Sequence, residues 1–309
     1  MLILIFIAGL FLLILGAEAM VRGACALAKK LKVSTLLIGI VIVGFGTSMP
    51  ELLTSLLSVV GKHSAPGIAA GNVIGSNIAN VLLVLGLSAA VSPIVFEKKS
   101  QIFNFAALLI SSAVLGTAIF LGGIGRMFGA LMVLLMLSYI VYGIIKDPRQ
   151  EEETVLESKG LFKSWIFSFL ITIIGLSVMI GGAKLLVHSA IDIAKAWGVS
   201  ETVIGLTIVA VGTSLPELAA SLVSAIHKES GVAVGNIIGS NIFNALFILG
   251  VTGIIKPFPI PEELWLDFVV MLGTTIIFII MAAKRKIPRP AGLAFLLLYA
   301  LYVAFLIKR

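Results

Sequence analysis

Apolar stretches of roughly 20 residues follow one another along the chain, separated by short polar clusters. A helix of that length spans a bilayer, so the pattern predicts an all-α, polytopic membrane protein. A large soluble core is the alternative, but it would not confine the charges to short clusters between apolar runs. We expect ten transmembrane helices, at residues 2–28, 35–60, 67–91, 102–121, 126–146, 162–194, 202–226, 231–255, 264–283 and 290–307.

Two polar motifs recur inside these apolar stretches. GTSMPE at 46–51 returns as GTSLPE at 212–217, and GNVIGSNIAN at 71–80 returns as GNIIGSNIFN at 235–244. Carboxylates, hydroxyls and amides are expensive inside a bilayer, so their presence at this depth indicates a functional site. Because both motifs occur twice, the pattern predicts one site built from two halves of the chain.

A polar loop divides the chain near its middle. KDPRQEEETVLESKG at 146–160 predicts a linker at 147–161 between a first five-helix repeat at 1–146 and a second at 162–309. An odd number of helices per half makes the second half enter the membrane in the opposite orientation. The halves are therefore expected to be inverted repeats about a pseudo-two-fold axis in the membrane plane. Duplication without shared function is the alternative, but it would not make the polar residues the best-matched ones.

Each GTS-x-PE motif predicts a broken helix. Pro50 and Pro216 have no amide hydrogen, so the helix kinks there and backbone carbonyls are expected to be freed. Hydroxyls and one carboxylate per copy add further oxygens, and such a set suits hard cations such as Na⁺ and Ca²⁺. The candidate ligands in this motif are Glu51, Glu217, Thr47, Thr213, Ser48, Ser214 and the carbonyls of Gly44 and Ala210. Purely structural kinks and hydroxyls bonded to their own helix are the alternative, but a mid-span carboxylate without a role is rare.

The second motif predicts a helix that packs closely against the broken one. Its glycines recur four residues apart, which lets two backbones approach; they are Gly71, Gly75, Gly235 and Gly239. Two polar pairs at four-residue spacing share a helical face and are expected near the glutamates: Ser76 and Asn80 near Glu51, Ser240 and Asn244 near Glu217. Asn77 and Asn241 are expected to bond to a neighbouring helix, outside the innermost shell.

Charge counting narrows the ligand. Two ionised glutamates carry two negative charges, and the serines and asparagines around them are neutral. One Ca²⁺, two Na⁺ or two protons would neutralise the site. That equivalence suits an exchanger, because an empty charged site is costly to reorient through hydrocarbon. A channel would favour a continuous wet pore lined by rings of like residues.

The composition agrees with a multi-pass protein of the cell membrane. The 309 residues are 60% hydrophobic and 12% charged, with a formal net charge of +7. Fourteen of the 22 Lys and Arg residues fall in connections on one side of the expected bilayer and six on the other. The positive-inside rule then places the loop 147–161 in the cytoplasm and both termini outside. This distribution explains the basic charge without a nucleic-acid partner. The single Cys25 and three unclustered histidines give no zinc-site spacing.

These residues resemble the α-repeats of the cation/calcium exchanger superfamily, most closely those of its prokaryotic sodium/calcium exchangers. The resemblance rests on G-T-S-x-P-E paired with G-S-N-I-x-N in each half. It implies ten helices in inverted repeats and electrogenic antiport of Na⁺ against Ca²⁺. It also implies Ca²⁺ ligation by Glu51 and Glu217 with oxygens of Thr47 and Thr213, flanked by Na⁺ sites at Ser48, Ser76, Ser214, Ser240 and the carbonyls of Gly44 and Ala210. The first and sixth helices, 2–28 and 162–194, would slide across the bundle to alternate access.

Potassium-dependent relatives characteristically carry an aspartate where this chain has Asn244. With asparagine at both 80 and 244, we expect potassium-independent transport. A proton/calcium antiporter is the nearest alternative, because two membrane glutamates can carry protons, although the hydroxyl-rich GTS segments favour Na⁺. Mg²⁺ is disfavoured because it demands octahedral geometry and retains water. An intramembrane enzyme would need a nucleophile–base pair, and Ser48 with Glu51 has no accompanying histidine.

Glu18 and Lys184 occupy matched positions in GAEAMVRGA at 16–24 and GAKLLVHSA at 182–190. Arg22 stands one turn after Glu18, so we expect an ion pair within this helix, with a gating role for Glu18 as a further hypothesis. No cofactor and no obligate protein partner are expected; the partners are Na⁺, Ca²⁺ and the lipid bilayer.

Overall fold

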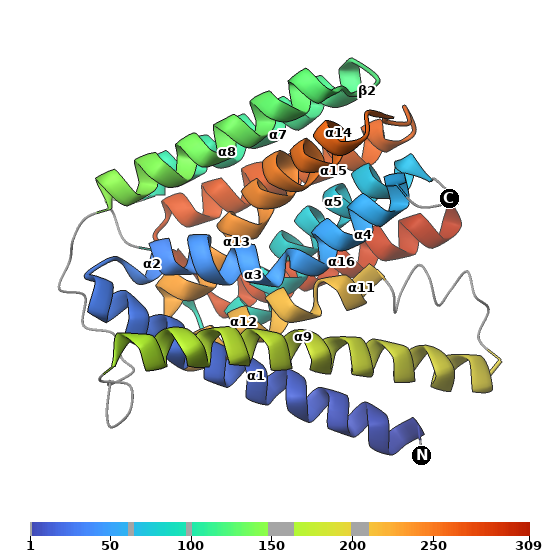
Figure 1. The fold of residues 1–309 in the computed structure, drawn as a ribbon. Helices are drawn as coiled ribbons and strands as arrows, with labels where there is room; N and C mark the ends of the chain where they lie inside the picture. The colour runs from blue at the N-terminus through green and yellow to red at the C-terminus, as the bar shows by residue number, and fades with distance from the viewer. Residues whose placement is uncertain (1, 61–64, 97–100, 148–163, 199–209) are drawn as a thin grey trace.

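Apolar helices form nearly the whole of the structure, a computed structural model (Figure 1). It describes residues 2–60, 65–96, 101–147, 164–198 and 210–309. The helices of the first half, with π-helical segments marked η, are α1 (Leu2–Leu31), α2 (Thr35–Ile38), η1 (Gly39–Gly44), α3 (Phe45–Thr47), α4 (Met49–Val60), α5 (Pro66–Ala79), η2 (Asn80–Leu85), α6 (Gly86–Val91), α7 (Gln101–Phe120) and α8 (Arg126–Lys146). Those of the second half are α9 (Trp165–Ala196), α11 (Ala210–Thr213), α12 (Leu215–Ile226), α13 (Ser230–Ile242), η5 (Phe243–Ile248), α14 (Leu249–Ile255), α15 (Leu264–Ala283) and α16 (Arg289–Lys308).

Most of the predicted spans are confirmed as long apolar helices. Within the described ranges, eight helices are long and apolar enough to cross a membrane, and the bent pair Thr35–Thr47 and Met49–Val60 makes a ninth. The span predicted at 202–226 begins in residues outside the described ranges, and its described part ends with α12. The count of ten therefore stays a prediction.

The two halves interleave. α13 packs against η1 and α2, α14 against α8, and α16 against α6, so each of these contacts joins one half to the other. Two antiparallel strand pairs add further links between the halves. β1 (Ile94–Val95) pairs with β4 (Lys286–Ile287), and β2 (Gly123–Ile124) pairs with β3 (Phe258–Pro259). A site between the halves is thus held by packing from both sides.

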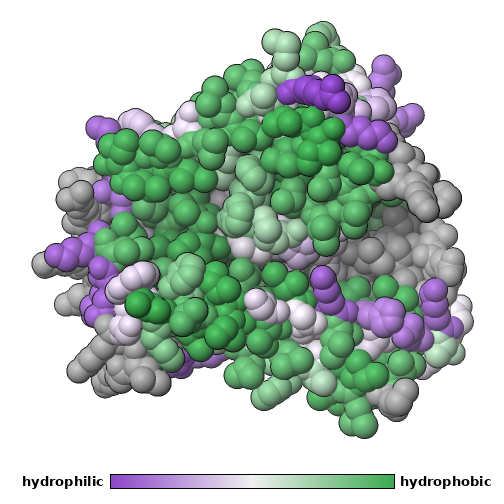
Figure 2. Space-filling model, in the orientation of Figure 1, coloured by the Kyte–Doolittle hydropathy of each residue, from purple (hydrophilic) through white to green (hydrophobic). Residues whose placement is uncertain are grey.

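The helices that carry the GN-x-IGSNI-x-N motif form the centre of the bundle. In the most apolar 18-residue stretches of Gly67–Val91 and Ser230–Ile255, 78% and 83% of the residues are buried within the protein, compared with 22% in that of α1. The face in Figure 2 is predominantly hydrophobic. Large apolar side chains such as Ile3, Phe11 and Met127 are exposed on the outer helices. Exposed apolar helices around a polar centre suit a lipid environment.

α1 and α9 lie side by side along one edge of the bundle (Figure 1). Glycines make this contact close, because a Cβ on Gly9 would lie 2.6 Å from Leu186 N and one on Gly175 would lie 2.5 Å from Met20 N. Such backbone contact is possible only where a side chain is missing. The two long helices therefore form one tightly packed pair.

Candidate cation site

Two interrupted helices frame the site. The helix at 35–60 bends by 42° between Thr47 and Met49. Ser48 at this break has φ −84° and ψ 5°, and Ser214 between α11 and α12 has φ −88° and ψ 5°. The proline is the second residue of the following helix in both copies, where its missing amide hydrogen costs no helical hydrogen bond. The predicted breaks are confirmed, and each lies two residues before its proline.

Glu51 and Glu217 are enclosed at these breaks. Their exposed fractions are 0% and 1%. Both carboxylate oxygens of Glu51, and Oε2 of Glu217, have no hydrogen-bond partner among the described residues. Within that part of the chain, neither carboxylate forms an ion pair. A buried carboxylate is costly unless it is paired or binds a metal ion, so the enclosure favours a cation ligand.

A hydrogen bond joins the two copies of GTS-x-PE. Ser48 Oγ donates to Glu217 Oε1 at 3.1 Å. The matching hydroxyl, Ser214 Oγ, is buried without a partner in the described ranges. The two motifs therefore meet, because a serine of the first copy reaches the carboxylate of the second.

Residues of the first break also contact α13. Thr47 Oγ1 donates to Asn236 Oδ1 at 3.0 Å and lies 3.4 Å from Ser240 Oγ. Thr47 and Ser240 both face the Glu217 carboxylate as well, so Ser240 lies near Glu217 as predicted. Its additional contact with the first half was not predicted, and it follows from the packing of α13 on η1.

The Gly44 carbonyl, predicted to be freed by the break, is engaged in hydrogen bonds. It accepts from Ser48 N at 3.2 Å, from Thr47 Oγ1 at 3.3 Å and from Ser240 Oγ at 3.2 Å. The prediction of a free carbonyl is wrong here, because hydroxyls on both helices can turn back to the backbone. In the second copy, Ser214 N donates to the Val211 carbonyl at 3.1 Å, so the backbone of Ser214 does not occupy the Ala210 carbonyl.

Four amides connect the two central helices. Asn80 Nδ2 donates to Asn241 Oδ1 at 3.0 Å, and Asn244 Nδ2 donates to Asn77 Oδ1 at 3.1 Å. Asn77 and Asn241 in turn donate to each other's backbone carbonyls at 3.1 Å and 3.4 Å. This confirms that Asn77 and Asn241 bond to a neighbouring helix. It also leaves Oδ1 of Asn80 and Asn244 buried without a donor among the described residues, and such an oxygen can bind a cation.

Both asparagines predicted as ligands, Asn80 and Asn244, stand in π-helical turns, where the helix widens. Asn80 begins η2, and Asn244 is the second residue of η5. A π-helical turn inserts one residue into the helical repeat and is frequent at functional sites. A further π-helical segment, η1, leads into the first break. Sequence periodicity did not predict these turns.

A second pair of amides supports the glutamate-bearing helices. Asn72 Nδ2 donates to Ser55 Oγ at 3.1 Å and, at 3.4 Å, to the backbone carbonyl of the glutamate on that helix. Asn236 Nδ2 makes the matching bonds, to Ser221 Oγ at 2.8 Å and to the backbone carbonyl of the other glutamate at 3.1 Å. Both serines stand four residues after the glutamate. That recurrence is visible in the sequence, and our prediction did not use it.

The remaining predicted residues lie beside this cluster. Ser76 is buried on α5 with an exposed fraction of 5%. Ala210 begins α11. Thr213 lines a cavity of about 350 Å³ together with Thr54 of α4 and Lys184 of α9. The cavity reaches both prolines of the breaks, Pro50 and Pro216. It therefore lies between α9 and the two broken helices, next to the breaks that precede the glutamates.

Comparison with known proteins places this geometry in a family. The family model described as sodium/calcium exchanger protein matches residues 1–145 and 167–308. A membrane protein of Methanocaldococcus jannaschii without an assigned activity is 37% identical, over 97% of this chain and 96% of its own length. The sodium/calcium exchanger MaX1 of Methanosarcina acetivorans is 31% identical, over 98% of this chain and 97% of its own length.

A solved structure has the same fold. The structure of the sodium-calcium exchanger NCX_Mj, soaked with Na⁺ and Ca²⁺, superimposes with a TM-score of 0.85 and 35% sequence identity. The match covers 98% of this chain and 97% of that one. The similarity therefore extends over both halves of the chain.

Proposed function

The chain belongs to the sodium/calcium exchanger protein family, and from that premise we propose that its buried oxygen cluster carries Ca²⁺ in exchange for Na⁺. The protein is an antiporter of a multi-pass membrane family, not an enzyme. The cluster holds its cations at the centre of the bundle and opens alternately to the two sides of the membrane.

The observation that carries this proposal is the set of buried carboxylate and amide oxygens without a partner among the described residues. These are both carboxylate oxygens of Glu51, one of Glu217, and Oδ1 of Asn80 and Asn244. Carboxylate and amide oxygens are the ligands that Ca²⁺ and Na⁺ prefer, whereas soft metals prefer sulfur and nitrogen. Their charge of −2 is balanced by one Ca²⁺ or by two Na⁺, so both ions can relieve the same cost of burial.

The ligands are assigned as follows. Ca²⁺ binds between Glu51 and Glu217 with oxygens of Thr47 and Thr213 and the amide oxygens of Asn80 and Asn244. The Na⁺ sites lie on either side of it, at Ser48, Ser76, Ser214, Ser240 and the carbonyls of Gly44 and Ala210. In the present conformation Gly44 is hydrogen-bonded, so its carbonyl serves Na⁺ only after Thr47 or Ser240 turns towards the ion.

We assign ten helices to an inverted repeat of residues 1–146 and 162–309, joined by a linker at 147–161. Matched conformations at Ser48 and Ser214, and matched amide contacts in the two halves, support this relationship. The excess of Lys and Arg on one side places the linker in the cytoplasm and both termini outside.

Transport is electrogenic and independent of K⁺. Electrogenic exchange requires a ratio other than two Na⁺ per Ca²⁺, and the separate serine sites provide room for more than two. Asparagine at both 80 and 244 leaves no third carboxylate to hold K⁺. No protein partner is required in this scheme.

The test uses purified protein in liposomes loaded with Na⁺ and diluted into Na⁺-free buffer with radioactive Ca²⁺. We expect Ca²⁺ uptake that needs internal Na⁺, accelerates when the interior is made positive, and does not change on adding K⁺ at a clamped potential. Uptake that follows a pH gradient and ignores Na⁺ would overturn Na⁺ as the coupling ion and establish the proton/calcium alternative. A strong rise with K⁺ would overturn the potassium-independent assignment alone.

A further inference from the structure

The α1–α9 pair meets the rest of the bundle through an apolar surface. Leu13, Ala17 and Met20 of α1 belong to one buried cluster with Val43 of η1 and Ala220 of α12. Apolar contact is not directional, so a surface of this kind permits one element to slide over another without breaking specific bonds. A directional polar contact between α1 and another element would restrain this sliding.

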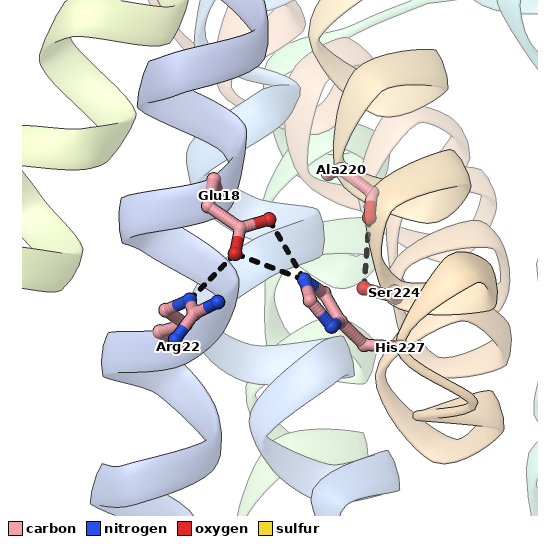
Figure 3. A network of polar contacts seen from close by, with 5 residues as sticks. All are labelled: Glu18, Arg22, Ala220, Ser224 and His227. Carbon is pink, nitrogen blue, oxygen red and sulfur yellow. Dashed lines mark hydrogen bonds and ion pairs between the residues drawn. The ribbon is translucent and has the colours of Figure 1, made fainter. Parts of the chain in front are cut away.

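One polar contact attaches α1 to another part of the structure. His227 Nε2 lies 2.9 Å and 2.8 Å from the two carboxylate oxygens of Glu18, and Arg22 Nε donates to the same carboxylate at 2.5 Å (Figure 3). Because a carboxylate only accepts, His227 is the donor. Among the described residues, no other side-chain hydrogen bond or ion pair joins α1 to another element. The Glu18–Arg22 pair was predicted, and His227 was not.

The contact is positioned to hold α1 against α12. His227 follows the last residue of α12, the helix that carries Glu217. Side chains of Glu18 and His227 are 32% and 22% exposed, so water reaches the pair only partly. Any sliding of α1 relative to α12 must stretch a hydrogen bond that is now short.

The matched position on α9 has the opposite environment. Lys184, which corresponds to Glu18 in the repeat, lines the cavity beside Thr213 and Pro216. Within the described ranges, Lys184 forms no ion pair. Thus the two matched positions differ: Glu18 of α1 is bonded to His227, whereas Lys184 of α9 lines a cavity.

We propose that the Glu18–His227 contact, which we call the latch, holds α1 against α12 and so closes the cation pathway where these two helices meet. The contact breaks and forms again in every transport cycle. This inference rests on the proposed exchange function. A hydrogen bond to an ionised carboxylate is stronger than one between neutral groups, so this contact can restrain α1. Arg22 of α1 bonds to the same carboxylate, and Lys228 and Glu229 follow His227 in the chain.

The direct test locks the latch covalently. In a Cys25→Ser background, Glu18→Cys and His227→Cys are joined with a short bifunctional methanethiosulfonate reagent. Na⁺-driven Ca²⁺ uptake is expected to fall in proportion to the cross-linked fraction and to recover on reduction. Glu18→Cys with Arg22→Cys is the matched control, because a link within one helix does not restrain its movement against α12. Full transport by protein cross-linked between positions 18 and 227 would overturn the proposal.

A second measurement needs no cross-link. His227→Ala removes the donor to the Glu18 carboxylate, so its exchange rate is expected to be about threefold that of the parent. His227→Gln keeps a hydrogen-bond donor, so its exchange rate is expected to stay close to that of the parent. Equal exchange rates for the parent and His227→Ala would contradict the latch. If the parent itself lacks Na⁺-driven uptake but exchanges protons for Ca²⁺, the proposed coupling ion fails, and both latch tests are read on that exchange.

Discussion

The side-chain amide of Asn80 donates a 3.0 Å hydrogen bond to Oδ1 of Asn241, in the opposite half of the chain. Asn244 repeats the contact with Asn77 at 3.1 Å. Because the nitrogen of each donating amide faces its acceptor, its Oδ1 points away from that acceptor, and Oδ1 of Asn80 and Asn244 is buried without a donor among the described residues. Asn77 and Asn241 therefore orient the two proposed amide ligands, although neither is assigned to touch a cation.

Asn241→Ala should weaken Ca²⁺ binding by about tenfold, the effect of one lost hydrogen bond to a buried group. The loss arises because Asn80 can then rotate and pair its oxygen elsewhere. Calorimetric titration of Ca²⁺ in detergent measures it. Asn104→Ala is the matched control. Asn104 on α7 is also a buried amide, and its Oδ1 accepts a hydrogen bond from the Tyr139 hydroxyl at 2.8 Å. Parent-like Ca²⁺ affinity in Asn241→Ala would refute the orienting role.

Glu51→Gln and Glu217→Gln should each abolish exchange while the protein remains folded. Either change removes half of the charge that balances Ca²⁺. In the parent, Ca²⁺ at 100 times its dissociation constant should add about 2.7 kcal/mol to the free energy of unfolding. That gain, measured as a shift in thermal unfolding, should be lost in both variants. A variant that retained the full shift would show that its carboxylate is not a ligand.

The predictable part of the fold is the part that depends on contrast between apolar and polar residues. The spans and the motif residues follow from the cost of polar groups in hydrocarbon. The breaks at Ser48 and Ser214 follow from the prolines beside them. The paired motifs also indicated that Asn80 and Asn244 belong to one site.

The remainder depends on which helices meet across the halves. Thr47 bonds to Asn236, and the Gly44 carbonyl is occupied, because α13 packs on η1. No local pattern specifies that contact. The Glu18–His227 contact was hidden for a further reason. His227 lies between the two motifs of the second half, where that half is two residues shorter than the first. The repeat therefore does not fix which residue of the first half corresponds to it.

Asn244→Asp should make the protein more dependent on Ca²⁺ for its stability. The change adds a third carboxylate to a site where Asn244 Oδ1 is already buried without a donor. Without a cation, the extra buried charge should cost about 1–3 kcal/mol of unfolding free energy. The variant should also bind Ca²⁺ more tightly than the parent does, because the third carboxylate adds a charged ligand. The gap between thermal unfolding temperatures with and without Ca²⁺ should therefore widen. Asn244→Ala, which removes an oxygen and adds no charge, should narrow it.

Lys184→Gln should raise the apparent Ca²⁺ affinity on the cavity side. Lys184 lines the cavity that reaches the breaks, so its charge repels entering cations. At low ionic strength we expect the KM for Ca²⁺ to fall about threefold, and the difference should disappear at about 1 M salt, where the Debye length is about 3 Å. Lys195→Gln, on the same helix but outside the cavity lining, is the control. An effect that is equally large at high salt would point to a steric cause.

The last prediction separates two adjacent glycines on α9. A Cβ on Gly182 would meet the backbone of Leu13 and lie 2.8 Å from the Gly9 carbonyl, whereas a Cβ on Gly181 has no atom within 4 Å. Gly182→Ala must therefore push α1 away from α9, at a cost of about 1–3 kcal/mol. Gly181→Ala should be neutral or stabilising by up to about 1 kcal/mol, because alanine favours a helix. Thermal unfolding measures both changes.

The same two variants test whether α1 and α9 work as one body. If the pair moves as a unit, spreading its contact also displaces Glu18 from His227. Gly182→Ala should then raise the exchange rate in the same direction as His227→Ala, and adding His227→Ala to it should change the rate no further. Gly181→Ala should keep both the parent rate and its response to His227→Ala. Equal rates for Gly181→Ala and Gly182→Ala, together with unequal stabilities, would show that the packing of the pair supports the fold but not the movement.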